Sequence, residues 1–185
     1  MESKAILFHS NIEEKCVGFL KGDVDLICST NKYDDIWLGT GMYFWDNKGN
    51  AKWWRTCQSK KHPGKCFKVL RVNADISKIL DLTDYDISEK LGELWEKYCL
   101  IIGEDSDVGL GYKLNTLFSA ISDFSEKYNV IKVYGRYNKT PTNGILNISY
   151  NMERAEPTIA VKCIYNVKDK NCIIEKEMLK ENDYE

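Results

Sequence analysis

The amino-acid sequence predicts an α+β protein: a split sandwich of two small β-sheets with helices inserted among the strands. Three observations favour this class. Short apolar segments with strand character are separated irregularly by helical segments, and do not alternate strictly with them. Two segments show clear helical periodicity. Neither GxGxxG nor GxxxxGK[ST] occurs, so the common phosphate-binding loops of parallel sheets are not used.

The size and charge of the chain limit the possible classes of protein. Its 185 residues predict one domain over 1–185, large enough to bury a core without disulfides or metals. The net charge of -2 gives no general support for binding to nucleic acid or membranes. One local basic patch is a candidate, although a solvated face is the favoured interpretation. The patch comprises Lys52, Arg55, Lys60, Lys61, Lys65 and Lys68.

The cysteines and the apolar segments predict a cytoplasmic protein with reduced thiols. Seven cysteines are present without a CxxC pair, and the N-terminus does not have the layout of a signal peptide. No apolar run approaches the roughly 20 residues that span a bilayer, so no membrane association is expected. Cys57, His62 and Cys66 are close in sequence, but a structural zinc site needs four ligands. We therefore expect no metal.

The first half of the chain contains three predicted strands and two predicted helices. Alternation or apolar character predicts strands at Ala5–His9 and at Cys66–Val72, and the glycine-punctuated loop at Asp34–Phe44 runs into a further strand. Helical spacing predicts helices at Glu13–Lys21 and Lys48–Lys60.

The second half contains two longer helices and two further strands. Periodic apolar residues predict helices at Ser88–Ile102, with Ser88 as the cap, and at Tyr112–Tyr128. Strands are expected at Val130–Tyr134 and Thr158–Ile164. From about Glu175 the chain is charged, and we expect a frayed tail.

Two segments carry candidate chemistry. In Leu7–Asn11 (LFHSN), His9 ends an apolar strand and would lie at a sheet edge, although a structural histidine is the commoner outcome for such a residue alone. In Trp37–Asp46 (WLGTGMYFWD), two glycines precede an aromatic run. Strand alternation places Tyr43 and Trp45 on one face and Met42 and Phe44 on the other, so one face could be core and the other a ligand platform.

Together, these two segments resemble the ADP-ribosyltransferase superfamily, in the branch with a His-Tyr-Glu-type site. That branch includes the diphtheria-toxin-like enzymes and the poly(ADP-ribose) polymerases. The sequence is most similar to small bacterial and phage members that act as toxins or in defence. The resemblance extends from about Leu7 to about Ile173, and includes the helix with Ala51, Lys52 and Trp53, the segment Leu80–Asp84 and the late strand.

The resemblance implies a mono-ADP-ribosyltransferase with an ADP-ribosyltransferase-like split sandwich fold and NAD as co-substrate. His9 would orient the ribose, Tyr43 would stack on nicotinamide, and Glu156 would stabilise the oxocarbenium-like centre. The acceptor would be a macromolecule, either protein or nucleic acid. An antitoxin or regulatory partner is a further family-level expectation. The residues expected to contact NAD are His9, Ser10, Asn11, Gly41, Tyr43 and Trp45.

The identity of the acidic residue is open at the level of sequence. Glu156 directly precedes the late strand, where the family places its glutamate, and Glu153 is a second candidate. In relatives an acid or amide often stands at the place of Thr158, and if that is the equivalent position the protein would be weak or inactive. A binding module for NAD or ADP-ribose and an NAD glycohydrolase are therefore the alternatives. Arg154, two residues before Glu156, argues against an arginine acceptor.

Overall fold

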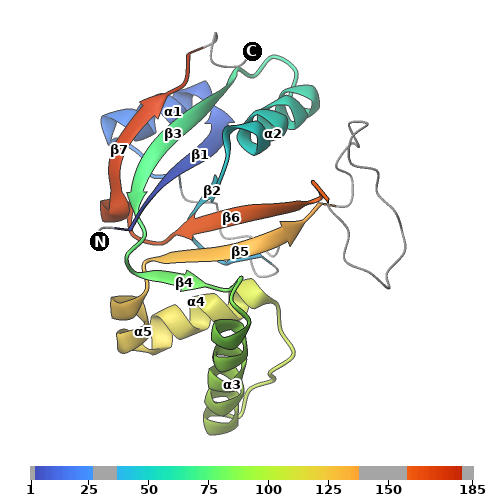
Figure 1. Ribbon diagram of the computed structural model, residues 1–185, viewed down its shortest axis with the longest axis vertical. Coiled ribbons are helices and arrows are strands. Elements are labelled where there is room, and N and C mark those ends of the chain that lie inside the picture. Colours follow the sequence, from blue (N-terminus) through green and yellow to red (C-terminus); the bar gives the residue numbers. More distant parts are fainter. Residues whose placement is uncertain (1–2, 27–36, 138–157, 181–185) are drawn as a thin grey trace.

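The computed structural model describes residues 3–26, 37–137 and 158–180, and within these ranges the protein is a mixed α+β fold (Figure 1). Five α-helices are present in the described residues: α1 Glu13–Lys21, α2 Lys48–Lys61, α3 Tyr85–Ile102, α4 Leu110–Ala120 and α5 Ser122–Lys127. The strands are β1 Lys4–Ile12, β2 Met42–Trp45, β3 Phe67–Asp75, β4 Ile79–Asp81, β5 Val130–Arg136, β6 Val161–Val167 and β7 Ile173–Met178.

The seven strands form one sheet in the order β4-β5-β6-β2-β1-β3-β7. Only β4 and β5 run parallel, and the other neighbours are antiparallel. The expected pair of separate sheets is therefore wrong, since β1 and β2 connect the two halves. That connection is a single paired position, Phe8 with Trp45, and Figure 1 shows the two halves turned relative to each other. The chain thus has one sheet with a weak seam between β1 and β2.

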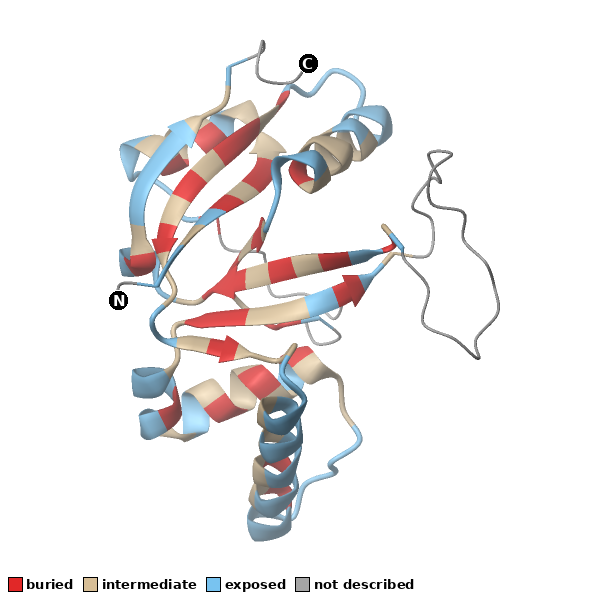
Figure 2. Ribbon diagram, in the orientation of Figure 1, coloured by how far each residue is buried: buried red, intermediate tan, exposed pale blue. Residues whose placement is uncertain are grey.

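Two hydrophobic cores cover the sheet (Figure 2). The first includes buried side chains of α1, β1, β2 and β3, among them Cys16, Leu7, Phe44 and Leu70. The second lies under α3, α4 and α5 and includes Trp95. Helix α2 packs on β1 and β3, and successive residues of a strand point to opposite faces. The buried residues Phe67 and Val69 therefore face α2, while their neighbour Leu70 faces α1.

The predicted helices are confirmed in the first half of the chain and partly wrong in the second. Helix α1 has the predicted bounds, and α2 is one residue longer than predicted. Helix α3 begins before Ser88, because the Asp84 side chain caps it by accepting a hydrogen bond from the Ile87 amide at 3.1 Å.

The single helix expected at Tyr112–Tyr128 is instead two helices, α4 and α5. The break is at Ile121, whose backbone is extended, with φ -120° and ψ 103°. This break turns α5 so that the ring of Phe124 packs against that of Phe118, with 4.9 Å between centroids. The apolar stripe therefore continues across a break that periodicity alone does not reveal.

Residues Ile173–Met178 form a strand, so the expectation of a frayed tail is wrong for Glu175–Met178. Strand β7 pairs with β3, and Arg71 Nη1 donates to Glu177 at 2.8 Å. Ile173 and Met178 pack against the first core. Strand β6 also begins three residues later than the predicted Thr158–Ile164. No helix in the described ranges is long and apolar enough to cross a membrane.

Candidate functional site

The paired ladder between β1 and β2 ends where the two sequence motifs meet, and we call the unpaired stretch beyond the Phe8–Trp45 pair the opening. Beyond the Phe8–Trp45 pair, an antiparallel register would continue with His9 opposite Phe44 and Ser10 opposite Tyr43. The two strands do not pair there: β1 remains paired with β3, and β2 with β6. The backbone ladder between the two strands is therefore interrupted beside His9, Ser10 and Tyr43.

The imidazole of His9 takes the place of a missing backbone pair at this opening. Its Nδ1 donates to the Tyr43 carbonyl oxygen at 2.6 Å, and its Nε2 lies 3.3 Å from Asn11 Nδ2. The side chain is only 9% exposed, and burial lowers the pKa of His9 to about 4. The ring is therefore neutral at pH 7, with the proton on Nδ1 and an acceptor on Nε2.

The alternation expected for β2 is confirmed. Met42 and Phe44 are buried in the first core, whereas Tyr43 and Trp45 are half-buried and pack against the second. The ring of His9 lies 5.6 Å from that of Phe44, so His9 shares the face of Phe44. His9 and Tyr43 are therefore joined through the Tyr43 backbone, while their rings are on opposite faces of the sheet.

The glycine turn before β2 is held rigidly from three sides. The Tyr43 hydroxyl donates to the Gly39 carbonyl at 2.6 Å and accepts from the Leu38 amide at 3.1 Å. The buried Asn166 Nδ2 donates to the Leu38 carbonyl at 2.9 Å, and Lys168 donates to the carbonyls of Leu38 and Thr40. The turn therefore positions β2 and leaves little freedom to the Tyr43 ring.

Gly41 is required for the close approach of this turn to β6. Its φ is +149°, and a Cβ at this position would lie 1.7 Å from Asn166 Oδ1. The sequence motif thus reflects a packing requirement, in addition to any contact with a ligand.

Ser10 presents a buried hydroxyl at the opening. The residue is 6% exposed, and its Oγ makes no hydrogen bond within the described residues. By alternation along β1 it faces the same side as Tyr43 and Trp45. An unsatisfied buried hydroxyl costs stability, and such groups in native proteins call for an explanation such as a ligand or a water molecule.

A group of aromatic side chains lies beside the opening, and we call it the aromatic cluster. It consists of Trp37, Trp45, Trp53, Trp54 and Tyr137. Trp45 contacts Trp54 of α2 and Tyr137 next to β5, with centroid distances of 6.3 and 5.5 Å. The cluster therefore links both halves of the sheet on the Tyr43 face.

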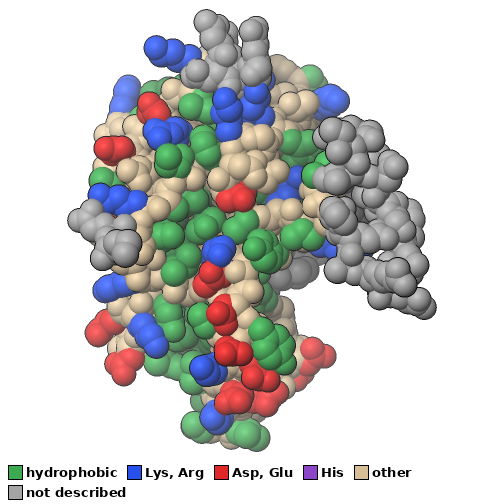
Figure 3. Space-filling model, in the orientation of Figure 1, with side chains coloured by type: hydrophobic (Ala, Val, Ile, Leu, Met, Phe, Trp, Pro, Cys, Tyr) green, Lys and Arg blue, Asp and Glu red, His purple; other side chains and the backbone are tan. Residues whose placement is uncertain are grey.

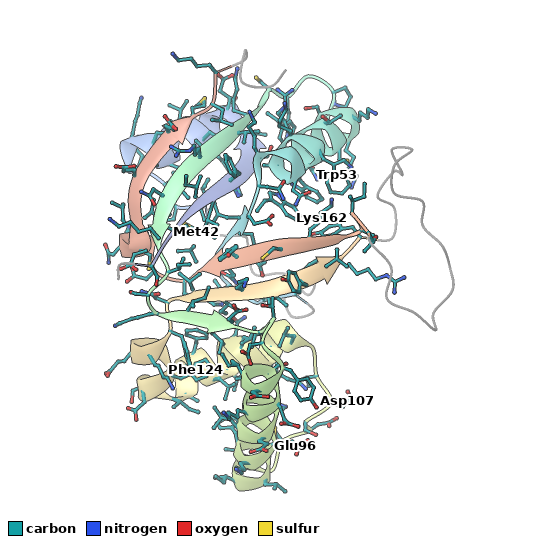
Figure 4. The ribbon with its side chains drawn as sticks, viewed as in Figure 1. Met42, Trp53, Glu96, Asp107, Phe124 and Lys162 are labelled. Atoms are coloured by element: carbon teal, nitrogen blue, oxygen red, sulfur yellow. The ribbon has the colours of Figure 1, made fainter. Side chains whose placement is uncertain are left out.

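Lys162 is the charged group of this cluster, and Figure 4 shows it on β6 beside Trp53 of α2. Its Nζ lies 5.0 Å from the Trp53 ring centroid and donates to Asn50 Oδ1 at 3.0 Å and to the Ile159 carbonyl at 3.3 Å. The residue is 6% exposed, and no carboxylate of the described chain forms an ion pair with it. Burial lowers the pKa of Lys162, while the charge of Asp46 opposes this shift.

The candidate acidic residues have different positions relative to the site. Glu153 and Glu156 lie outside the described residues. Thr158 is exposed, and its Oγ1 accepts from the Ala160 amide at 3.0 Å, so it stabilises the turn before β6. The first β6 side chain that faces the aromatic cluster is Lys162, a cation at the start of the strand where the sequence analysis expects a carboxylate.

Lys162 and Tyr137 belong to the site but are not among the residues expected from the sequence. A signal for Lys162 exists in the alternation of β6, since Lys162 has the same parity as the buried Ile164 and Asn166. Tyr137 has no comparable signal, because it follows β5 and joins the cluster only through tertiary packing.

Comparisons with known proteins identify no relative for this arrangement. No protein-family model, curated protein or solved structure matches the chain. Among the residues that the structure describes, no group of three or more His, Cys, Asp or Glu side chains is close enough to hold a metal ion.

Proposed function

We propose that the protein is a mono-ADP-ribosyltransferase that cleaves NAD at the opening between β1 and β2 and transfers ADP-ribose to a macromolecule. The observation that carries the proposal is the seam itself. The two motifs lie 34 residues apart in sequence, and they meet where His9 Nδ1 binds the Tyr43 carbonyl. Within the described residues, β1 and β2 share the single pair Phe8–Trp45, and the ladder does not continue to His9 and Tyr43.

The polar groups at the opening suit a ribose and an amide. Because His9 is neutral and holds its proton on Nδ1, its Nε2 can accept a hydrogen bond from a ribose hydroxyl in place of the Asn11 amide. The Ser10 hydroxyl can donate or accept, which suits the carboxamide of nicotinamide. A ligand that reaches both faces of the sheet would replace the Asn11 contact of His9 on one face and satisfy Ser10 Oγ, which makes no hydrogen bond in the described chain, on the other.

The proposed reaction breaks the bond between C1′ of the ribose and the nicotinamide nitrogen. Nicotinamide leaves with the bonding electron pair, and positive charge develops on the ribosyl carbon. Glu156 would stabilise this charge, since a carboxylate near the oxocarbenium-like centre lowers the barrier. A nucleophile of the acceptor then bonds to C1′ and loses its proton. The expected setting is an intracellular toxin or a defence effector, with an antitoxin or regulatory partner.

A second candidate function, a non-catalytic binding module for NAD or ADP-ribose, is favoured by one observation. Lys162 places a buried positive charge in the aromatic cluster, on the strand that follows the expected acidic residue. A buried ammonium opposes the cationic nicotinamide ring and the ribosyl cation but attracts a diphosphate. Binding without turnover would follow if Lys162, and not Glu156, is the charged group that meets the ligand.

A labelling experiment separates these functions. The purified protein is incubated with NAD labelled in its adenylate part and a cell lysate, and parallel samples receive protease or nuclease. A transferase puts label into a macromolecular band and releases nicotinamide. A glycohydrolase releases ADP-ribose without any macromolecule, and a binding module gives neither product but still binds NAD.

The Glu156→Gln variant provides the matched control. A catalytic Glu156 predicts loss of transfer with unchanged thermal unfolding and unchanged NAD binding. Full transfer by this variant would contradict the role of Glu156, and the absence of any nicotinamide release by the wild-type protein would contradict catalysis.

A further inference from the structure

We propose that α2 binds single-stranded nucleic acid, with bases stacked on Trp53 and Trp54 and phosphates held by the lysines of its last turn. The binding stands on the geometry of α2 alone. The additional statement that the bound strand is the ADP-ribose acceptor rests on the proposed function.

The charge of α2 is of one sign. The helix contains Lys48, Lys52, Arg55, Lys60 and Lys61 and no acidic residue. Lys60, Lys61 and the following Lys65 are exposed. By contrast, α3 and the loop after it gather acidic residues, and Figure 3 shows Asp and Glu side chains concentrated over that end of the molecule. The net charge of -2 therefore averages a basic surface and an acidic one. A local basic surface attracts phosphates whatever the net charge.

The aromatic residues of α2 provide the second, independent requirement. Trp53 and Trp54 are half-buried and adjacent to each other, with ring centroids 6.1 Å apart. Proteins that bind single strands without base pairing combine a basic track with aromatic side chains on which bases stack. A charged helix without such rings would bind duplex as well as single strands, so the tryptophans are what favour the single strand.

The spacing of these residues puts rings and charges on the same side of α2. Trp53 and Lys60 are seven residues apart, as are Trp54 and Lys61, and seven residues are close to two turns. At 1.5 Å per residue each lysine lies about 10 Å along the helix from its tryptophan. A strand that follows the helix can therefore stack a base at one end and place its phosphates against the lysines at the other.

The position of α2 connects this surface with the opening in the sheet. Helix α2 packs on β1 and β2, and Trp54 contacts Trp45 of β2. Lys162, over the ring of Trp53, adds a buried cation at the same end of the helix. A nucleotide stacked on Trp53 would thus lie on the aromatic cluster and close to the seam. Lysines in the last turn also interact favourably with the helix dipole, but that interaction does not require the tryptophans on the same helix.

Binding is measured by the fluorescence anisotropy of labelled oligothymidylate and oligouridylate of about 15 nucleotides, over a range of salt concentrations. The test variant is Lys60→Gln/Lys61→Gln, and the matched control is Lys90→Gln/Lys97→Gln on α3. Each lost phosphate contact should reduce the slope of log K against log salt by about 0.7, so the test variant should lose about 1.4 and bind on the order of tenfold more weakly. The control variant should bind as the wild-type protein does.

Each outcome decides a separate point. Quenching of tryptophan fluorescence by the single strand, together with weaker binding of the matched duplex, supports stacking. Equal weakening by both double variants, or no binding at low salt, overturns the inference. Binding with no cleavage of NAD leaves the nucleic-acid surface standing and contradicts the proposed function. Cleavage of NAD by a protein that binds neither oligonucleotide supports the proposed function and contradicts the nucleic-acid surface. A preference for oligothymidylate indicates DNA as the bound strand, and a preference for oligouridylate indicates RNA.

Discussion

The two faces of the sheet at the β1–β2 seam differ in how completely their buried polar groups are bonded. On the α1 face, Leu7, Phe44 and the neutral His9 are at most 9% exposed, and the imidazole bonds to the Tyr43 carbonyl and Asn11. On the α2 face, Ser10 Oγ has no hydrogen bond in the described chain, and Lys162 has no described counter-ion. We call these the closed face and the open face.

This difference suggests that the two faces contribute differently to folding stability and to ligand binding. Buried apolar contacts and a satisfied histidine stabilise the closed face. The open face carries polar groups that lower stability unless something binds them. A substitution of an apolar residue on the closed face should therefore lower the free energy of unfolding strongly, while one at Ser10 or Lys162 on the open face should change ligand binding with little effect on folding.

The largest expected effect is at the turn that brings β2 to the seam. Replacing Gly41 by Ala forces a Cβ to within 1.7 Å of Asn166 Oδ1 at a backbone φ of +149°. We expect the free energy of unfolding to fall by at least roughly 4 kcal/mol, or the protein not to fold. Urea denaturation followed by circular dichroism measures this. Wild-type stability in the variant would mean that the turn can move away from β6.

A pair of substitutions in β2 compares the faces directly. Phe44→Ala on the closed face should lower the free energy of unfolding by about 3–5 kcal/mol, because Phe44 is 1% exposed in the core. Trp45→Ala on the open face should lower it by only about 1–2 kcal/mol, because Trp45 is half-buried. Both are measured by urea denaturation. Equal losses would remove the distinction between the faces.

The pH dependence of stability tests the closed face at His9. Its pKa of about 4 lies below the unfolded value of 6.5, so between these pH values only the unfolded chain binds the proton. The free energy of unfolding should therefore fall by up to roughly 3 kcal/mol as the pH drops from about 6.5 to 4. The difference between the wild-type protein and His9→Gln isolates this contribution, because the carboxylates titrate in both. Parallel pH profiles would show that His9 has the same pKa in the folded and the unfolded chain.

The smallest effect on stability is expected at Lys162. Lys162→Met keeps the long apolar stem and removes a buried ammonium without a described counter-ion. The melting temperature should stay the same or rise slightly, by an amount equivalent to about 1 kcal/mol or less. Thermal unfolding measures this, and NAD or ADP-ribose binding to the same variant shows whether the charge serves a ligand. A marked loss of stability would assign Lys162 a structural role.

Local patterns in the sequence predicted much of the secondary structure but not the connectivity of the sheet. The helix at Glu13–Lys21 and the strands around His9 and Phe44 depend on periodicity, which a few neighbouring residues determine. The break at Ile121 depends on the packing of Phe124 against Phe118, and the cap at Asp84 on a competition between two acceptable capping residues. Both contacts are local, but periodicity does not show at which residue the apolar stripe is interrupted or which of two capping residues is used.

The sequence motifs indicated which residues of the first two strands belong to the candidate site, but not the contacts that these residues make. The meeting of His9 with Tyr43 was expected from a resemblance, but its form was not: a side chain bonds to a backbone carbonyl, with the two rings on opposite faces. The charge at the start of β6 depends on which residue faces inward. Placing the strand three residues too early drew attention to Thr158 and away from Lys162.

The outer strands of the sheet have a consequence for the behaviour of the protein at high concentration. An exposed strand edge offers unpaired amides and carbonyls that can template aggregation. Here one edge is β4, which is only three residues long, and the other is β7, whose centre carries Glu175, Lys176 and Glu177. Short length on one side and alternating charge on the other both discourage a second chain from extending the sheet. The charged residues of β7 thus disfavour the addition of further strands and so disfavour fibril formation.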